Sequence, residues 1–374
     1  NNHFFTASSN YDKISDQEII FICVPTPVTE NKSPDISFIM NSAEEVFKRV
    51  KKHSLIILKS TTFPGTTEDF VQPLFESKGW KAGKDFYLSF SPERVDPGNK
   101  IYNTGNTPIV VGGVSKKCSE LSVLIMQEVA TKVHMVSSPR VAEMEKLLEN
   151  IFRSVNIALV NEMARLCDRM GKINIWEVIE AASTKPFGFM PFYPGPGIGG
   201  HCIQIDPYYL DWAAKQYDFH TKFIELAAES NEEMPFYVKD MVMKDLANLP
   251  IKAANANVLV LGTTFKRDVE DYRNSPAIKV IELLYKEGIT NINFHDPYMR
   301  TIRLMDKIFR VQELNEKLLR DADVTVIVTD HTSYDYEWIV DFSKRVIDTR
   351  NATKKIKNNR EKISLLGACT YKVT

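Results

Sequence analysis

The chain has 374 residues, a length that predicts two or three domains rather than one hydrophobic core. Hydrophobic residues make up 44% and charged residues 25%, which is typical of a globular protein in water. The net charge of -1 gives no reason to expect binding to nucleic acid or to an anionic membrane surface. No apolar run reaches transmembrane length, and residues 1–15 lack the pattern of a signal peptide.

Five cysteines lie far apart in the sequence, and no two of them form a CxxC motif: Cys23, Cys118, Cys167, Cys202 and Cys369. The odd number and the wide spacing argue against a disulfide framework and against a zinc site, so no metal is expected. This cysteine usage predicts a reducing, cytoplasmic setting. One of the five is a candidate reactive thiol, and the others are expected to be small core residues.

The first third of the chain alternates apolar, strand-like segments with segments of helical periodicity. Strands are predicted at residues 18–25, 54–61, 86–93 and 107–113, and helices at 37–52, 64–79 and 116–130. The first two of these strands are expected to be buried. Strand–helix alternation of this kind is typical of βαβ units and a parallel sheet.

The middle of the chain is predicted to be helical. Residues 138–183 open with Ser138 and Pro139 and carry apolar residues at three- and four-residue spacing over more than 30 positions. Such a long helix often forms the spine of a domain or a dimer contact. A loop rich in proline and glycine follows at 187–202, and helices resume at 206–249.

The last part of the chain returns to strand–helix alternation. Strands are predicted at residues 257–265, 291–298, 322–331 and 345–351, and a helix at 276–288. We therefore predict an α/β fold in which two Rossmann-like, doubly wound parallel-sheet domains are joined by a central helical domain with a long helix. The expected boundaries are 1–136 for the first domain, 137–249 for the helical domain and 250–374 for the last.

The motif G-x-G-x-x-G occurs once, at Gly195, Gly197 and Gly200. It indicates dinucleotide binding when it follows a strand and opens a helix, whereas here it follows residues 192–194 and contains Pro196. We interpret it as a substrate loop in which glycines let backbone N–H groups approach a ligand, with a phosphate-cradling turn as the alternative. Because a Rossmann domain usually begins with such a motif, the first domain is expected to lack its first βαβ unit.

Specific motifs follow one another along nearly the whole chain. They are CVPTP (23–27), KSTTFPGTT (59–67), SPERVDPG (91–98), EMEKLLEN (143–150), GPGIGGHCIQIDPYYLDW (195–212), LGTTFKRDVEDYRNSPA (261–277), HDPY (295–298) and VIDTRN (346–351). Together these motifs resemble the UDP-glucose/GDP-mannose dehydrogenase family. Within that family the pattern is most similar to the branch that acts on UDP-N-acetylhexosamines.

The resemblance implies that NAD is the cofactor and that the C6 alcohol of a UDP-sugar is oxidised twice, to a carboxylate. UDP-N-acetylglucosamine is the expected substrate, and UDP-N-acetylmannosamine and UDP-glucose are the alternatives. A protein that binds nucleotide sugars without catalysis is an alternative of a different class. The long central helix leads us to expect a homodimer, and the resemblance implies a product used for surface polysaccharide or for protein glycosylation.

Cys202 is the expected catalytic thiol. A thiol can capture the intermediate aldehyde as a thiohemiacetal, which loses a second hydride to become a thioester that water hydrolyses. Asp206 and Pro207 predict a helix start with Asp206 as the N-cap, and a helix N-terminus lowers the pKa of a nearby thiol. The resemblance adds proton handling or water positioning by Asp206. The alternatives are a buried, inert cysteine and an aspartate that only caps a helix.

Four more catalytic residues are implied by the resemblance. Lys146 and Asn150 are four residues apart, so they share one helix face, and they would stabilise a developing alkoxide or oxyanion. Glu93 and Thr61 both stand at the ends of predicted strands, where α/β sheets bind ligands. Glu93 would act as a base or orient water during thioester hydrolysis, and Thr61 would order water and contact the nicotinamide. A solvated lysine and a surface salt bridge of Glu93 are the alternatives.

Further residues match family positions that contact the ligands. The expected cofactor contacts are Val24, Pro25, Thr26, Thr61 and Arg273, and the expected UDP-sugar contacts are Lys266, Arg350, Gly197, Gly199 and Gly200. Arginine suits a pyrophosphate because its guanidinium donates two parallel hydrogen bonds. The alternative for each cation is an ordinary surface side chain.

Overall fold

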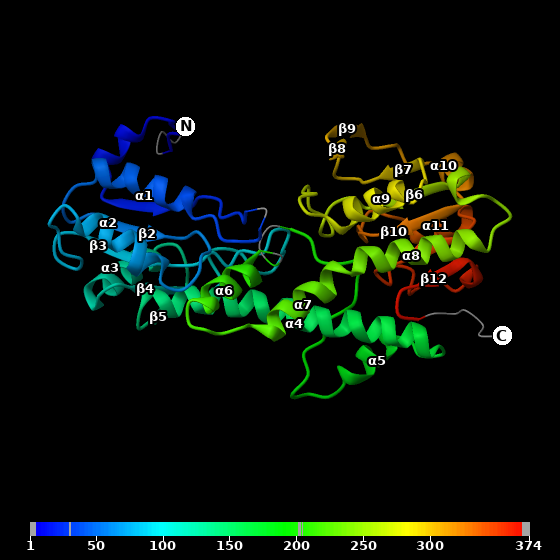
Figure 1. Ribbon diagram of the computed structural model, residues 1–374, viewed down its shortest axis with the longest axis horizontal. Coiled ribbons are helices and arrows are strands. Elements are labelled where there is room, and N and C mark those ends of the chain that lie inside the picture. Colours follow the sequence, from blue (N-terminus) through cyan, green and yellow to red (C-terminus); the bar gives the residue numbers. More distant parts are fainter. Residues whose placement is uncertain (1–4, 30, 201–202, 204, 369–374) are drawn as a thin grey trace. The chain divides into compact units, whose positions relative to one another are not determined.

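The computed structural model describes residues 5–29, 31–200, 203 and 205–368. The chain forms two compact units, the first from residues 1–151 and 205–221 and the second from the rest. Each unit contains a five-stranded sheet, and Figure 1 shows helices packed around the strands of each unit. The predicted helical domain contributes residues to both units, and its boundaries stay a prediction.

The sheet of the first unit is mostly parallel. Its strands, in spatial order, are β1 (Ile19–Ile22), β2 (Leu55–Leu58), β3 (Tyr87–Phe90), β4 (Ile109–Gly113) and β5 (Val133–Val136). Only the β3–β4 pair is antiparallel, which departs from the predicted all-parallel sheet. The described residues 91–108 between these strands contain no helix, so the chain returns beside β3 without the crossover that a parallel pair needs.

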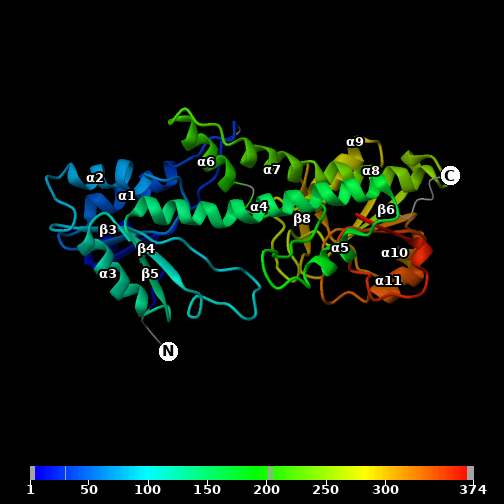
Figure 2. The ribbon, with the colours of Figure 1, turned by 90° about the horizontal axis from the view of Figure 1, so that it is seen from below.

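Helices cover both faces of the first sheet. They are η1 (Tyr11–Asp16), α1 (Ser37–Arg49), a π-helix η2 (Thr66–Val71), α2 (Gln72–Glu76) and α3 (Lys116–Gln127). Figures 1 and 2 show α1 and α2 on one side of the strands and α3 on the other. Ile56 and Leu58 accordingly pack in the core cluster of α1 and α2, while Leu55 and Ile57 pack in the cluster of α3.

Strand β1 is buried on one face only, so the prediction of a fully buried strand is wrong for it. Ile20 and Ile22 belong to the core, but the side chains of Ile19 and Phe21 are 37% and 42% exposed. The reason is the position of β1 at the edge of the described sheet, whereas α3 packs over β2, β3, β4 and β5.

The sheet of the second unit is parallel throughout. Its spatial order is β12 (Ile363–Leu365), β11 (Val346–Asp348), β10 (Val324–Ile327), β6 (Asn257–Leu261) and β7 (Asn291–His295). The chain passes from β6 to β7 on one side and then to β10 on the other. The strand order therefore reverses between β6 and β10, and in open α/β sheets ligands bind at the carboxyl ends of strands at such a point.

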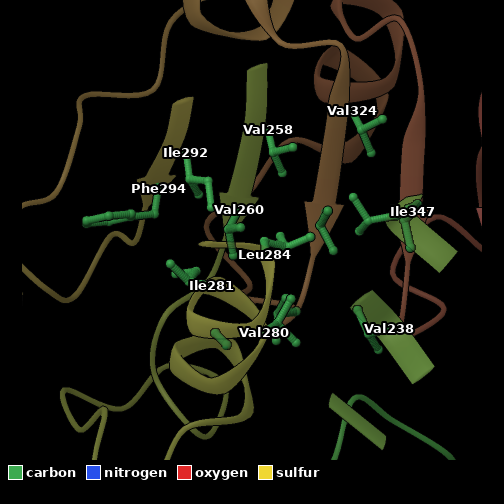
Figure 3. Close-up of a cluster of buried hydrophobic side chains, with 14 of the residues drawn as sticks. Val238, Val258, Val260, Val280, Ile281, Leu284, Ile292, Phe294, Val324 and Ile347 are labelled. Carbon is green, nitrogen blue, oxygen red and sulfur yellow. The ribbon is translucent and has the colours of Figure 1, made fainter. Parts of the chain in front are cut away.

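Both faces of the second sheet are also covered. The covering elements are α8 (Met234–Ala247) and α9 (Pro276–Lys286) on one face, and α10 (Glu316–Asp321) and α11 (Tyr336–Phe342) on the other. Figure 3 shows Val258 and Val260 of β6 beside Ile281 and Leu284 of α9 in the first of these cores. A hairpin of β8 (Thr301–Leu304) and β9 (Lys307–Arg310) adds two buried residues to it.

The long helix is present as α4 (Pro139–Met170), with 32 residues. The predicted helical segment 138–183 is interrupted after it, where Gly171 and Lys172 adopt positive φ angles. The remaining helices are α5 (Ile175–Ala182), α6 (Asp206–Lys215), α7 (Lys222–Glu232), and the short turns η3 (Ala253–Asn255) and η4 (Arg360–Lys362). In the described part of the chain, no helix has the length and apolar character needed to span a membrane.

Candidate active site

Three of the predicted catalytic residues meet in the first unit. Helix α4 carries Lys146 and Asn150, and Asp206 is the first residue of α6. The side-chain amide of Asn150 donates a hydrogen bond to the carboxylate of Asp206. Each of the three residues is less than a tenth exposed, so Lys146 is not a solvated surface lysine.

The environment of Asp206 changes its acidity. Burial raises the pKa of Asp206 to about 6, although the Asn150 hydrogen bond and the positive charge of Lys146 both act to lower it. A carboxyl group that titrates in this range can exchange protons near neutral pH. The predicted N-cap role of Asp206 is wrong. Ile205 holds the N-cap position and makes no side-chain capping hydrogen bond, and the Asp206 carboxylate accepts from the Asn150 amide instead.

Cys202 lies outside the described residues, and its catalytic role stays a prediction. The chain segment that follows it is fixed at Asp206 by the contact with Asn150. Tyr209, in the same helix α6, is 1% exposed and its hydroxyl donates to the carbonyl of Pro27. The first turn of α6 is therefore anchored in the core of the first unit.

Glu93 stands in the loop after β3 with its side chain about half exposed. One carboxylate oxygen accepts hydrogen bonds of 2.9 Å from the backbone N–H groups of Arg94 and Val95. The other lies 3.5 Å from the Nζ atom of Lys59, a residue that the sequence analysis did not select. The salt bridge given as an alternative thus exists, and it holds the carboxylate near the end of β2. The position of Lys59 directly after a buried strand was the available signal.

Four of the predicted cofactor contacts gather at the carboxyl ends of β1 and β2, which are adjacent and parallel. They are Val24, Pro25, Thr26 and Thr61. Ser60 joins the two strand ends, since its hydroxyl accepts from the N–H of Val24 at 2.8 Å and donates to the carbonyl of Val24 at 2.7 Å. This edge of an α/β sheet is where a dinucleotide fits, so the residues present agree with NAD binding.

Glu143 of α4, which the sequence analysis also missed, binds the loop that carries Thr61. The carboxylate of Glu143 is fully buried and accepts from the N–H of Gly65 at 2.6 Å, and from the N–H and hydroxyl of Thr67 at 2.9 and 2.7 Å. Burial raises the pKa of Glu143 to about 7, while these hydrogen bonds act to lower it. Its partners lie some 76 residues earlier in the chain, so local sequence gave no signal.

The predicted UDP-sugar contacts all lie in the second unit. Arg350 follows β11, and its Nε atom is 3.4 Å from the carboxylate of Asp330, which follows β10. Arg267 pairs with the same carboxylate, which is almost fully buried. Asp330 thus holds two guanidinium groups at the carboxyl end of the sheet, near the point where the strand order reverses.

The predicted glycines are required by close packing. A Cβ atom on Gly199 would lie 2.6 Å from the Cβ of Phe265 and 3.0 Å from the carbonyl oxygen of Asn274. Gly200 has a φ of +85°, and its N–H donates to the carbonyl of Arg273 at 3.1 Å. Gly197, at a φ of +127°, would place a Cβ against Pro235. These contacts explain the glycines without a ligand, and their substrate role stays a prediction.

Arg273, predicted as a cofactor contact, lies with these glycines in the second unit, whereas the other four cofactor contacts lie in the first. Its guanidinium pairs with Asp271 at 2.7 Å. The position of its backbone is set by the hydrogen bond that its carbonyl accepts from Gly200.

A buried network holds the loop of Lys266. Asp296 accepts hydrogen bonds from the N–H groups of Thr263 and Thr264 at 2.6 and 3.0 Å. The Nε2 atom of His331 is 3.1 Å from the same carboxylate, and its Nδ1 accepts from the N–H of Asp268. A neutral His331 with the proton on Nε2 satisfies both contacts, so the loop 263–268 is fixed at both of its ends.

Known proteins resemble this chain along most of its length. The chain matches three domains of one family, the UDP-glucose/GDP-mannose dehydrogenases: the NAD binding domain over residues 1–133, the central domain over 140–233 and the UDP binding domain over 259–355.

Individual relatives cover most of the chain. A UDP-N-acetyl-D-mannosamine dehydrogenase of Methanocaldococcus jannaschii is 35% identical over 91% of this chain and 73% of its own. A UDP-N-acetyl-D-glucosamine 6-dehydrogenase of Pseudomonas aeruginosa is 35% identical over 78% of this chain and 68% of its own. The solved structure of a UDP-D-ManNAc dehydrogenase from Pyrococcus horikoshii aligns with a TM-score of 0.86 at 32% identity, covering 96% of this chain and 84% of the other.

The predicted family and fold class are thereby confirmed, as is NAD as the cofactor. Lys146, Asn150 and Asp206 are buried in the first unit, and their catalytic roles stay a prediction. The chain belongs to the UDP-glucose/GDP-mannose dehydrogenase family and is an NAD-dependent nucleotide-sugar dehydrogenase.

Proposed function

We propose that this protein oxidises the C6 alcohol of a UDP-N-acetylhexosamine to the carboxylate. The relatives named above support an N-acetylated sugar, since both the M. jannaschii and the P. aeruginosa proteins carry names of that class. The sequence pattern favours UDP-N-acetylglucosamine. UDP-N-acetylmannosamine is the second candidate, because that substrate is named for the M. jannaschii and P. horikoshii proteins.

The observation that carries the proposed mechanism is the buried cluster of Lys146, Asn150 and Asp206. A lysine that is 9% exposed beside a buried carboxyl group offers a positive charge in a site of low polarity, where it stabilises an alkoxide more strongly than in water. Asn150 holds Asp206 by its amide, and Asp206 can take up and release a proton near neutral pH.

Held by the residues at the carboxyl ends of β1 and β2, NAD would supply the hydride acceptor for both oxidations. The thiol of Cys202 would add to the carbonyl carbon of the aldehyde formed first, giving a thiohemiacetal. Loss of a hydride from that carbon and of a proton from its hydroxyl leaves a thioester. Water would then attack the thioester carbon, with Glu93 accepting a proton of the water, and the carbon–sulfur bond breaks to release the acid and the thiol.

The two ligands would be held by separate sets of residues. Val24, Pro25, Thr26 and Thr61 at the strand ends of the first sheet would bind NAD. Lys266 and Arg350 at the strand ends of the second sheet would bind the diphosphate of the UDP-sugar, with Asp330 fixing the direction of the Arg350 guanidinium.

The test is NADH formation by the full-length protein with UDP-N-acetylglucosamine, UDP-N-acetylmannosamine and UDP-glucose in parallel. Two oxidations predict about two NADH per sugar consumed. Turnover of UDP-glucose alone would contradict the N-acetylhexosamine assignment, and no NADH with any of the three would contradict the function.

The Cys202→Ser variant tests the thiol. We expect a loss of steady-state turnover by at least about a thousandfold, because serine is a far weaker nucleophile at neutral pH. Cys167→Ala is the matched control, since Cys167 is a buried packing residue of α4 and should leave the turnover unchanged. Wild-type turnover in Cys202→Ser would rule the covalent mechanism out.

A further inference from the structure

We propose that Arg94 is a positioning residue that fixes the loop bearing Glu93 onto helix α4 beside Lys146. The proposal rests on the function proposed above for Glu93. Arg94 is not among the residues that the family motifs led us to select, and its contacts lie entirely within the first unit.

The guanidinium group of Arg94 uses all of its nitrogens to join three segments. Its Nε atom donates to Glu149 at 3.1 Å, and its Nη2 atom donates to Glu145 at 2.8 Å and also to Glu149. Its Nη1 atom donates to the carbonyl of Pro108 at 2.8 Å, directly before β4. The side chain is only 24% exposed, so these bonds are partly shielded from water. Arginine can make this set of bonds and lysine cannot.

The backbone of the same residue reaches the proposed base. The N–H of Arg94, like that of Val95, donates to the carboxylate of Glu93. Arg94 therefore holds the Glu93 carboxylate with its backbone N–H and helix α4 with its guanidinium group. Without the guanidinium contacts, the Glu93 carboxylate would be held, among the described residues, only by its Lys59 ion pair and these two backbone hydrogen bonds.

Arg94 also balances charge around Lys146. Glu145 precedes Lys146, and Glu149 lies one turn beyond it on α4. Burial and the adjacent Glu149 carboxylate raise the pKa of Glu145 to about 7, against the attraction of Arg94 and Lys146. Arg94 thus adds a second positive charge beside these two carboxylates, while the charge of Lys146 acts on Glu145, Glu149 and Asp206 alike.

The decisive readout separates the oxidations from the hydrolysis. In Arg94→Met the Glu93 carboxylate is displaced, and a displacement of about 1 Å costs roughly a hundredfold in rate. We expect a rapid burst of about two NADH per active site at a rate near that of the wild type, followed by a steady-state rate reduced at least about tenfold. KM for the UDP-sugar and for NAD should change little. Arg94→Lys should recover only part of the steady-state rate.

Arg165→Met is the matched control. Arg165 lies on α4, pairs with Glu233 at 2.5 Å and is similarly exposed, but among the described residues it contacts none of the predicted catalytic ones. It should leave burst and steady state unchanged. The double variant Glu145→Gln with Glu149→Gln removes the same anchor from the helix side. It should give the same burst pattern, and adding Arg94→Met to it should cost little more.

Two results would overturn the proposal. One is a steady-state rate in Arg94→Met equal to that of the wild type. The other is a burst slowed in the same proportion as the steady state, which is the pattern of general damage to the fold. If Arg94→Met does not fold, the double glutamine variant decides by the same two criteria. A wild-type protein that forms no NADH contradicts the proposed function instead, which keeps the two failures distinct.

Discussion

Asp206 shows how the surroundings of a single side chain decide its chemistry. Burial at the start of α6 raises the pKa of its carboxyl group to about 6, while the amide of Asn150 and the charge of Lys146 act to lower it. The hydrogen bond from Asn150 thus acts directly on the pKa of Asp206, although the two residues are 56 positions apart in the sequence.

The Asn150→Ala variant should move the acid limb of the pH–rate profile. Loss of a hydrogen bond to the charged form raises the pKa of Asp206 further, so kcat/KM should begin to fall at a pH about one unit higher than in the wild type. The measurement is kcat/KM for the UDP-sugar between pH 5 and 9. Asn156→Ala, also on α4, removes an amide that bonds only its own helix and serves as control. An unmoved acid limb would mean that Asp206 does not control it.

At this scale the sequence predicted residues but not their partners. The four-residue spacing of Lys146 and Asn150 correctly placed both on one helix face, because helical periodicity is a local property. Lys59, Arg94 and Glu143 were missed, since each acts through a partner far away in the chain. The same limit explains the wrong cap assignment of Asp206, whose partner is on another helix.

Among the elements, α4 has the most exposed apolar surface. Eight large apolar residues that are at least 38% exposed recur along it in steps of three, four or seven: Val141, Met144, Leu148, Phe152, Leu159, Met163, Leu166 and Met170. Such spacing places them along one stripe of the helix. A stripe of this length on a helix of 32 residues supports the predicted homodimer, in which α4 would pack against its copy.

Charges in the stripe should therefore separate the subunits. The double variant Leu159→Glu with Leu166→Glu is expected to weaken the dimer at least about tenfold, because each leucine loses about 1.5–3 kcal/mol of burial. Sedimentation velocity across a concentration series measures this. Phe223→Glu, at a 73% exposed position on α7, should leave the assembly as it is. A wild type that stays monomeric at every concentration would contradict the dimer.

Helices were predictable where their apolar periodicity was long, and strands where their apolar run was continuous. The helices α1, α3, α4 and α9 and the buried strands β2 and β6 occur where periodicity indicated them. β5, the β8–β9 hairpin, α10, α11 and β12 were missed, because each is short and mixes polar with apolar residues, unlike the continuous apolar runs of β2 and β6. The predicted helix 64–79 begins as a π-helix after Gly65, whose φ is 103°, and helical spacing does not reveal this.

For the whole molecule, the alternation of strands and helices was sufficient to predict two α/β sheets. It did not reveal the antiparallel β3–β4 pair, because strand direction depends on how the connection closes rather than on the strands themselves. Nor did it reveal the carboxyl groups of the first unit whose pKa values are raised, Glu143, Glu145 and Asp206.

The two units should accordingly respond differently to pH. A carboxyl group whose pKa is higher in the folded state stabilises the fold at low pH, and this contribution is lost as pH rises through the folded pKa. The first unit should therefore lose stability between about pH 5 and 8, and ionising Glu143 alone costs about 3 kcal/mol. In the second unit the pKa values of Asp268 and Asp296 lie below their ordinary range, so stability there should fall only at acid pH.

Hydrogen exchange followed by mass spectrometry resolves the two units within the intact protein. Peptides from β2 and β3 should exchange faster at pH 8 than at pH 5 after correction for intrinsic rates, and peptides from β6 and β10 should not. Glu143→Gln should reduce the difference, whereas Glu44→Gln, at an exposed position of α1, should not. An equal pH response of both sheets would refute the assignment.

Helix α4 binds three segments from one short stretch: Glu143 holds the loop after β2, Glu145 and Glu149 hold Arg94, and Asn150 holds Asp206. All three contacts depend on the rotational phase of a single helix, which turns by about 100° per residue. A deletion of one residue between 143 and 150 would rotate one set of contacts away from the other, even with every side chain retained. Natural variation of this stretch is therefore expected as substitutions, and insertions or deletions are expected to be excluded from it.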